Sequence, residues 1–258
     1  MIELKSPDEI EAMARSGAIV GALFGELEGR VEPGASTGDL DALAEEFIRS
    51  HEGAVPIFKG LYGFPGAVCI SVNREVVHGI PSQERLLQEG DLVSIDVGVK
   101  LDGWCSDSAR TFTVGEVSDE ARSLTETTRR ALDAAIEAAQ PASHVGDIGA
   151  AVEGVVEGTG YHIIQDLVGH GVGRDVHESP QVPNRGEPGA GPLLRPGLVV
   201  AIEPMIAVGT SRIRTLDDRW TVVTVDGSLS AHFEHTVAIT GEGPRILTGT
   251  VDPVRSVA

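Results

Sequence analysis

The sequence predicts an α+β fold of two pseudo-symmetric halves around a central antiparallel sheet, and three observations support this prediction. Helical periodicity precedes short runs rich in valine and isoleucine, and the same order occurs twice along the chain. Gly38-Asp39-Leu40 is repeated as Gly146-Asp147-Ile148, 108 positions later. Residues 92–96, LVSID, are repeated as residues 199–203, VVAIE, at an offset of 107. Chance similarity between short apolar segments is the alternative to an internal duplication.

Two predicted helices open the first half. Ser6-Pro7-Asp8-Glu9 has the pattern of a capping box with proline at the first helical position, and apolar residues follow at helical spacing over residues 10–27. Pro33-Gly34 breaks this helix. A second helical pattern covers residues 40–48.

Four runs rich in valine and isoleucine follow between glycines, and we expect each to form a strand. They cover residues 67–72, 74–80, 91–99 and 109–114. The second half repeats the order, because Ser118-Asp119-Glu120 can cap a helix that Pro141 ends before a further helix. No linker-like composition separates the halves. We therefore expect a single domain over residues 1–258, with internal halves of about 1–115 and 116–250.

Composition argues against several classes of protein. The 258 residues are 41% hydrophobic but contain no apolar stretch near the length of a membrane span, so we expect no membrane partner. Twenty basic and 39 acidic residues give a net charge of −19, which repels phosphate backbones and argues against nucleic acid as a partner. Two cysteines are too few for a disulfide framework, and the first residues lack the pattern of a signal peptide. We expect a cytoplasmic protein.

Two aspartates come together on one face of a predicted hairpin. Alternation along residues 91–99 places Asp96 on the face opposite the valines. Asp102-Gly103 is a strong turn signal, and the strand after it carries Asp107. A two-residue turn sets Asp96 opposite Ala109 and diagonal to Asp107, whereas a four-residue turn makes the aspartates direct partners. Both registers keep the carboxylates within roughly 8 Å on one face, and like charges this close need a cation.

Three further residues belong to the same candidate site. The repeat places Glu203 where the first half has Asp96, and Glu234 lies in a strand-like pattern, AHFEHTVAI. Burying four carboxylates together is implausible unless protons or metal ions neutralise them, although a strand end or an arginine partner could explain any one alone. His170, between glycines in VGHGVG, adds a neutral nitrogen ligand. This donor set favours manganese, iron or cobalt over a structural zinc site.

The motifs around these residues resemble those of the type I methionine aminopeptidases, which have the pita-bread fold. The resemblance covers nearly the whole sequence. The matching motifs are NREVVHGIP, SIDVGVKLDGWCSDSARTF, GHGVGRDVHESPQVPN, AIEPM and SLSAHFEHTVAIT. The five metal ligands of the family fall on Asp96, Asp107, His170, Glu203 and Glu234. By this resemblance Asp96 holds the first of two divalent ions, Asp107 and Glu234 bridge both, and His170 and Glu203 complete the second.

The resemblance also implies an activity, the removal of the initiator methionine from nascent proteins and peptides whose second residue is small. Two divalent ions, cobalt, manganese or iron, activate the attacking water in such enzymes. The resemblance implies that Glu203 shuttles a proton, that His177 polarises the scissile carbonyl and that His78 contacts the substrate backbone. The expected partners are nascent-chain amino termini, and a transient association with the ribosome is compatible with them. We expect a monomer, since the sequence contains no heptad run.

A methionine side chain needs an apolar, polarizable pocket. The loops flanking the matching motifs supply Phe58, Tyr62, Phe64, Cys69 and Trp220 as candidates. Only six Phe, two Tyr and two Trp occur in the chain, so this clustering favours a pocket. Core packing is the alternative for Phe58 and Tyr62, and a small buried hydrophobe is the alternative for Cys69.

Two other functions remain open. Proline-specific aminopeptidases and prolidases share the fold and the ligand set, but they typically carry a further amino-terminal domain, whereas the first helix here begins near residue 6. A pita-bread protein without catalysis could be a binding module for ribosomal or nucleic-acid partners, which the five ligands and the charge of −19 oppose. Type II enzymes carry a large insertion before the last ligand, and the 31 positions between Glu203 and Glu234 favour type I.

Overall fold

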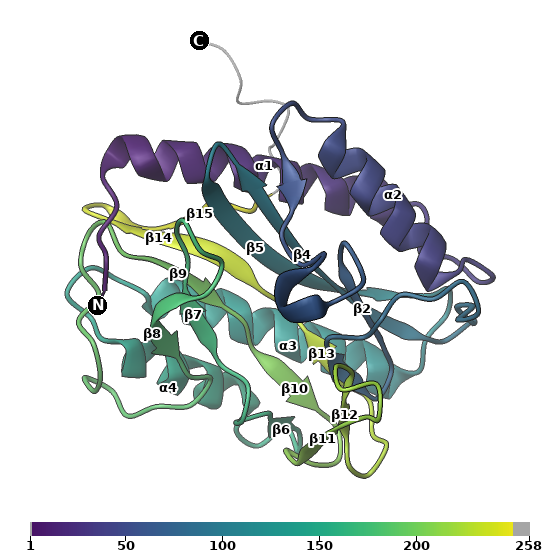
Figure 1. Cartoon of the computed structure of the whole chain (residues 1–258). Coiled ribbons are helices and arrows are strands. Elements are labelled where there is room, and N and C mark those ends of the chain that lie inside the picture. Colours follow the sequence, from purple (N-terminus) through teal and green to yellow (C-terminus); the bar gives the residue numbers. More distant parts are fainter. Residues whose placement is uncertain (1, 250–258) are drawn as a thin grey trace.

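A computed structural model gives the structure of residues 2–249 (Figure 1). Residues 1 and 250–258 lie outside the described part, and with them the last residues of the predicted domain. The helices are α1 (Pro7–Glu28), α2 (Thr37–Arg49), α3 (Asp119–Ala138) and α4 (Val145–Val156). The strands are β1 (Val55–Pro56), β2 (Cys69–Val72), β3 (Glu75–Val77), β4 (Leu92–Leu101), β5 (Trp104–Thr113), β6 (His162–Ile163), β7 (Gly169–Gly171), β8 (Glu178–Val182), β9 (Val199–Ile202), β10 (Met205–Ala207), β11 (Ile213–Thr215), β12 (Val222–Thr224), β13 (Ser230–His232), β14 (His235–Thr240) and β15 (Gly243–Ile246). Among residues 2–249, no helix is long and apolar enough to cross a membrane.

Helices α1 and α3 begin where the sequence predicts, and α2 begins three residues before the predicted pattern of residues 40–48. The Ser6 hydroxyl accepts from the Glu9 N–H (3.3 Å), and the Glu9 carboxylate accepts from the Ser6 N–H (2.9 Å), which completes the capping box of α1. Ser118 caps α3 by accepting from the Ala121 N–H (3.1 Å). These bonds occupy N–H groups that have no partner inside the first turn of a helix.

The hairpin of β4 and β5 has the register of the two-residue turn. Asp96 pairs with Ala109, and Asp107 pairs with Gly98, so the two aspartates are diagonal neighbours on one face. Both turn residues have positive φ, 52° at Asp102 and 83° at Gly103, as this tight turn requires. The strand predicted over residues 74–80 is shorter, because His78 has a φ of 58° and leaves the extended conformation after Val77.

The strand pairs are antiparallel, as predicted, but the predicted central sheet is divided into four hydrogen-bonded sheets. β4 lies between β1 and β2 and also pairs with β5 in the first half. In the second half, β15, β14, β9, β7 and β8 form the largest sheet. β5 approaches the second half where the Glu234 N–H donates to the Ala109 carbonyl (2.9 Å). The two larger sheets thus meet along β5.

Each helix pair covers the strands of its own half. On β4, Val93 and Ile95 lie in a hydrophobic core. Phe24 of α1 and Ile48 of α2 belong to the same core. In the second half, residues of α3 and α4 pack against β9 and β14. Figure 1 shows α1 along the upper edge of the molecule and α3 behind the strands of the second half.

The internal repeat of the sequence is also a structural repeat. Gly90 and Gly197, 107 positions apart, have φ values of 91° and 97°. The Gly90 N–H donates to the Val114 carbonyl and the Gly197 N–H to the Ile239 carbonyl, both at 2.8 Å. Glycine tolerates this left-handed conformation, which turns the chain into β4 and into β9. These matching turns support the predicted pseudo-symmetry, while the boundaries of the two halves stay a prediction.

Candidate metal centre

The five predicted metal ligands come from both halves and converge on one site. The first half contributes Asp96 on β4 and Asp107 on β5. The second half contributes His170 on β7, Glu203 directly after β9, and Glu234 between β13 and β14. The site therefore lies where the strands of the two halves meet.

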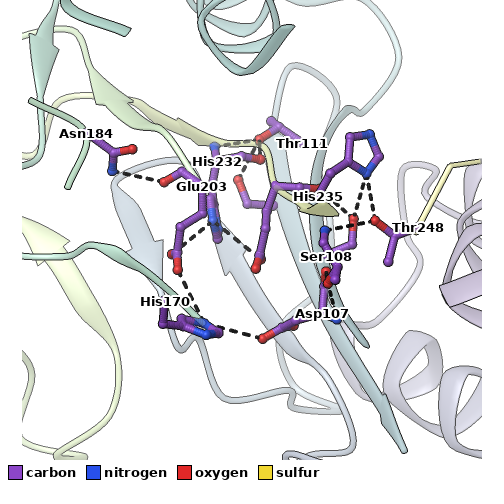
Figure 2. Close-up of polar contacts among 12 residues, drawn as sticks. Asp107, Ser108, Thr111, His170, Asn184, Glu203, His232, His235 and Thr248 are labelled. Atoms are coloured by element: carbon purple, nitrogen blue, oxygen red, sulfur yellow. Dashed lines mark hydrogen bonds and ion pairs between the residues drawn. The ribbon is translucent and has the colours of Figure 1, made fainter. Parts of the chain in front are cut away.

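The side chains approach one another closely without forming direct hydrogen bonds. His170 Nε2 lies 3.8 Å from Asp107 Oδ2 and 3.6 Å from Glu203 Oε1 (Figure 2). Asp107, His170 and Glu234 each offer one ligand atom, and these atoms lie within 4.8 Å of one another. Ligand atoms about 2.1 Å from one ion lie roughly 3–4 Å apart, so these separations fit a shared cation.

The carboxylates carry oxygen atoms that the protein leaves unpaired. Asp96 Oδ1, Asp107 Oδ1 and Glu234 Oε1 are buried and have no hydrogen-bond partner among the residues the structure describes. Burial raises the pKa of Asp96 to about 7. Burial, reinforced by neighbouring carboxylates, raises the pKa values of Asp107, Glu203 and Glu234 well above their ordinary range. The four carboxylates could not share this site unless cations or protons neutralised their charges.

His170 is in the form that binds metal ions. Burial, and then the neighbouring His177, lowers its pKa to about 4, so the ring is neutral at pH 7. Its Nδ1 lies 3.0 Å from the Gly171 carbonyl, which can only accept a hydrogen bond. The proton must therefore be on Nδ1, and Nε2 is left free toward Asp107 and Glu203. The donor set and its free atoms thus fit divalent ions.

A cavity of about 590 Å³ lies against these residues, and the structure brings every predicted site residue to it. The five predicted ligands line its inner wall. The residues predicted to contact substrate that also line it are Phe58, Tyr62, Phe64, Cys69, His78, His177 and Trp220.

An apolar corner of the cavity is built from loop residues. The Phe64 ring packs edge-on against Trp220, with ring centroids 5.1 Å apart. Phe58, Phe64 and Cys69 are buried in the same hydrophobic cluster, so they serve as core residues and as cavity wall at once. Tyr62 is 81% exposed, which rules out core packing and places it at the opening.

The two predicted substrate-contacting histidines lie on opposite loops. His78 stands edge-on to Trp220, with centroids 6.5 Å apart, and His177 stands edge-on to His170 at 4.5 Å. Burial lowers the pKa values of His78 and His177, so both rings are neutral at pH 7. His177 is exposed and also lines the cavity.

A buried ion pair holds the loop that carries His177. Lys5 Nζ lies 2.6 Å from Glu178 Oε2, and the Arg174 N–H donates to Glu178 Oε1 (2.8 Å). Burial alone would raise the pKa of Glu178, but the Lys5 ammonium and these backbone donors lower it below its ordinary value. A Cβ atom at Gly173 would lie 2.3 Å from Glu178 Oε1, so only glycine leaves room for this carboxylate.

His232, which was not among the predicted site residues, lines the same cavity. Its Nε2 lies 3.6 Å from Glu203 Oε2 and has no hydrogen-bond partner within the described part of the chain. Burial lowers its pKa to about 3. The sequence pattern could have predicted His232 as a site residue, because the two-residue period of a strand places His232 and Glu234 on one face.

The chain is similar to known metallopeptidases. The model of metallopeptidase family M24 matches residues 11–241. A methionine aminopeptidase from Clostridium perfringens is 52% identical over 248 residues, which are 96% of this chain and 99% of that protein. The crystal structure of a methionine aminopeptidase from Thermotoga maritima is similar with a TM-score of 0.94 and 44% identity, and the match covers 96% of this chain and 100% of that one.

Prolidases are more distant relatives by the same measures. The structure of a prolidase from Pyrococcus furiosus matches with a TM-score of 0.76 and 25% identity. The match covers 96% of this chain and 66% of that chain. The pita-bread architecture is therefore common to both groups, while the detailed similarity is to methionine aminopeptidases.

Proposed function

The chain belongs to metallopeptidase family M24 and, within that family, to the type I methionine aminopeptidases, and we propose how its side chains carry out the reaction. The reaction is hydrolysis of the bond after an amino-terminal methionine, in nascent proteins and peptides whose second residue is small. The observation that carries this proposal is one cavity that joins five convergent metal-ligand side chains to an apolar corner. The closer similarity to methionine aminopeptidases than to a prolidase supports the substrate.

The proposed cofactor is a pair of divalent ions, manganese, iron or cobalt. Asp96 would hold one ion, His170 and Glu203 the other, and Asp107 and Glu234 both. When bound, such ions lower the pKa of water enough to supply hydroxide near neutral pH. The free oxygen atoms on Asp96, Asp107 and Glu234 support this assignment, because each needs a positive partner.

Glu203 is the proposed proton carrier. It accepts the proton of the attacking water and delivers it to the leaving amine nitrogen. In the metal-free protein, burial and the charges of Asp96 and Asp107 raise the pKa of Glu203, which makes its carboxylate a stronger proton acceptor than a free one. Asn184 supports its position by donating to the Glu203 carbonyl (3.0 Å), as Figure 2 shows.

His177 and His78 are the proposed substrate-binding donors. Neutral imidazoles can donate one N–H each, His177 to the scissile carbonyl and His78 to the substrate backbone. Their positions on two sides of one cavity support these roles. The methionine side chain would fill the apolar corner of Phe58, Phe64 and Trp220, with Cys69 beside it and Tyr62 at the opening.

We extend the proposal to the setting of the reaction. The chain would act on nascent polypeptides in the cytoplasm as a monomer and a single domain, in transient association with the ribosome. Two free, buried cysteines support a reducing compartment.

The test is release of the first residue from Met-Ala-Ser and from an Ala-Pro-leading peptide. Metal-stripped protein would receive manganese, iron or cobalt. We expect metal-dependent release of methionine and little release of alanine. Preference for the Ala-Pro peptide would assign the chain to the proline-specific branch, and no release from either peptide by folded, metal-loaded protein would favour a binding module.

A further inference from the structure

Three buried hydroxyl groups join the two halves directly behind the candidate metal ligands. β5 and residues 230–236 run side by side, and within the described chain they share one direct backbone hydrogen bond, from the Glu234 N–H to the Ala109 carbonyl (2.9 Å). On either side of this bond, side-chain hydroxyls connect the backbones instead. We call the strip formed by Ser108, Thr111 and Thr236 the hydroxyl seam.

The two threonines make matching pairs of bonds. The Thr236 hydroxyl accepts from the Asp107 N–H (2.9 Å) and donates to the Asp107 carbonyl (2.7 Å). The Thr111 hydroxyl accepts from the His232 N–H (2.9 Å) and donates to the His232 carbonyl (2.9 Å). In an ordinary antiparallel ladder the facing backbone would make both bonds. Here a single threonine hydroxyl takes the place of the facing backbone on each side of the Glu234–Ala109 bond.

The third hydroxyl holds the backbone of Glu234, the other residue that would contact both ions. Ser108 Oγ donates to the Glu234 carbonyl (2.6 Å), and Figure 2 shows it close to Asp107. Ser108 and Thr236 are fully buried, and Thr111 is 5% exposed. Water therefore does not compete for these bonds, and each lost hydroxyl would leave buried backbone groups unpaired.

We propose that Ser108, Thr111 and Thr236 are positioning residues that set the separation of Asp107 and Glu234, and with it the spacing of two metal ions. This inference rests on the proposed two-metal site. A hydroxyl inserted between strands holds their backbones farther apart than a direct N–H···O bond, which leaves room for both carboxylates. Paired metal sites work at about 3.5–4 Å, so small displacements matter.

The test measures manganese binding rather than activity. Metal-stripped Thr236→Val and Ser108→Ala would be titrated with Mn²⁺ by calorimetry, and electron paramagnetic resonance would detect the exchange-coupled pair at two equivalents. We expect binding about 10- to 100-fold weaker for Thr236→Val, with loss of the coupled signal. Thr236→Ser keeps a hydroxyl and should restore both. Thr128→Val is the matched control, because Thr128 is buried and donates only within α3, to the Leu124 carbonyl (2.8 Å).

The outcomes separate this inference from the proposed function. If Thr236→Val folds, binds Mn²⁺ as tightly as the unchanged protein and gives the same exchange-coupled signal, the proposed role of the hydroxyl seam is wrong. The proposed function is then unaffected. If that variant does not fold, unchanged Mn²⁺ binding by Ser108→Ala would overturn the role of the seam instead. A single ion in the unchanged protein would overturn both proposals. Two coupled ions that depend on Thr236, without release of methionine, would support the seam and contradict the proposed activity.

Discussion

The inner and outer walls of the cavity are built in different ways. The inner wall consists of strands and the residues directly at their ends, and Asp96 and Asp107 occupy fixed positions of the β4–β5 ladder. The outer wall includes the loop around the short helix Leu61–Gly63, where Gly60, Tyr62 and Gly63 have φ values of 86°, 50° and 90°. The metal ligands, which need exact placement, are therefore held by a rigid strand ladder. The residues proposed to contact the methionine side chain of the substrate lie largely on loops. Changes in the inner wall should lower turnover, and changes in the outer wall should weaken substrate binding.

The largest expected effect comes from Glu203→Gln in the inner wall. The amide keeps the shape of the side chain but removes a metal-binding charge and the proposed proton carrier. We expect kcat for Met-Ala-Ser to fall about 1000-fold or more. The control is Glu153→Gln, which breaks a surface ion pair with Arg185 (2.6 Å). A fall in kcat no greater than that of the control would contradict the role of Glu203.

His177→Ala tests the loop that borders the inner wall. The variant loses the proposed donor to the scissile carbonyl, and we expect turnover to fall by about 100-fold or more. His51→Ala removes a histidine at the end of α2 that packs on Phe47, 5.0 Å between ring centroids, and should leave turnover unchanged. Unchanged turnover in His177→Ala would remove His177 from the mechanism.

Phe64→Leu tests the outer wall. It removes the ring that packs on Trp220, and we expect KM for methionine peptides to rise about 10-fold with little change in kcat. Phe47→Leu is a matched control on α2, away from the cavity. A loss confined to kcat would show that the apolar corner does not bind the methionine side chain in the way proposed.

The smallest expected effect is on stability and pH in the metal-free protein. The pKa of folded Asp96 is about 7, above the ordinary 3.8, so its contribution to stability is full below about pH 4, falls as pH rises from there, and is nearly all lost at pH 7. His170 and His232 have lowered pKa values and act in the opposite direction, but their contribution is nearly complete above pH 7. Asp107, Glu203 and Glu234, whose pKa values are raised well above their ordinary range, continue the loss above pH 7. We therefore expect the Tm of metal-free protein to fall by about 2–4 °C between pH 7 and pH 8 relative to metal-loaded protein. Equal pH dependence of the two forms, measured by calorimetry, would contradict strain among these carboxylates.

The strand wall could be predicted from sequence because it follows local rules. Residue alternation and the Asp102-Gly103 turn determine that Asp96 and Asp107 share a face, and the observed register is the one that a two-residue turn predicts. The repeat led to Glu203 by the same logic. The same two-residue periodicity places His232 on the face of Glu234, although His232 was not predicted as a site residue.

The loops and the contact between halves could not be predicted in the same way. Tyr62 and His78 have left-handed backbone conformations, and neither is a glycine, asparagine or aspartate, the residues that usually signal this conformation in a sequence. Between β5 and residues 230–236, the predicted single sheet is interrupted where Thr111 and Thr236 replace backbone pairs with hydroxyl bonds. Threonine is common in strands for reasons of shape alone, so the sequence did not distinguish these positions from others.

The most direct test of the central claim is anomalous diffraction from crystals of the manganese-loaded protein. We expect two manganese peaks in the cavity, with Asp107 and Glu234 in contact with both, Asp96 with one, and His170 and Glu203 with the other. A single peak, or peaks that these five side chains do not contact, would contradict the account of the metal centre.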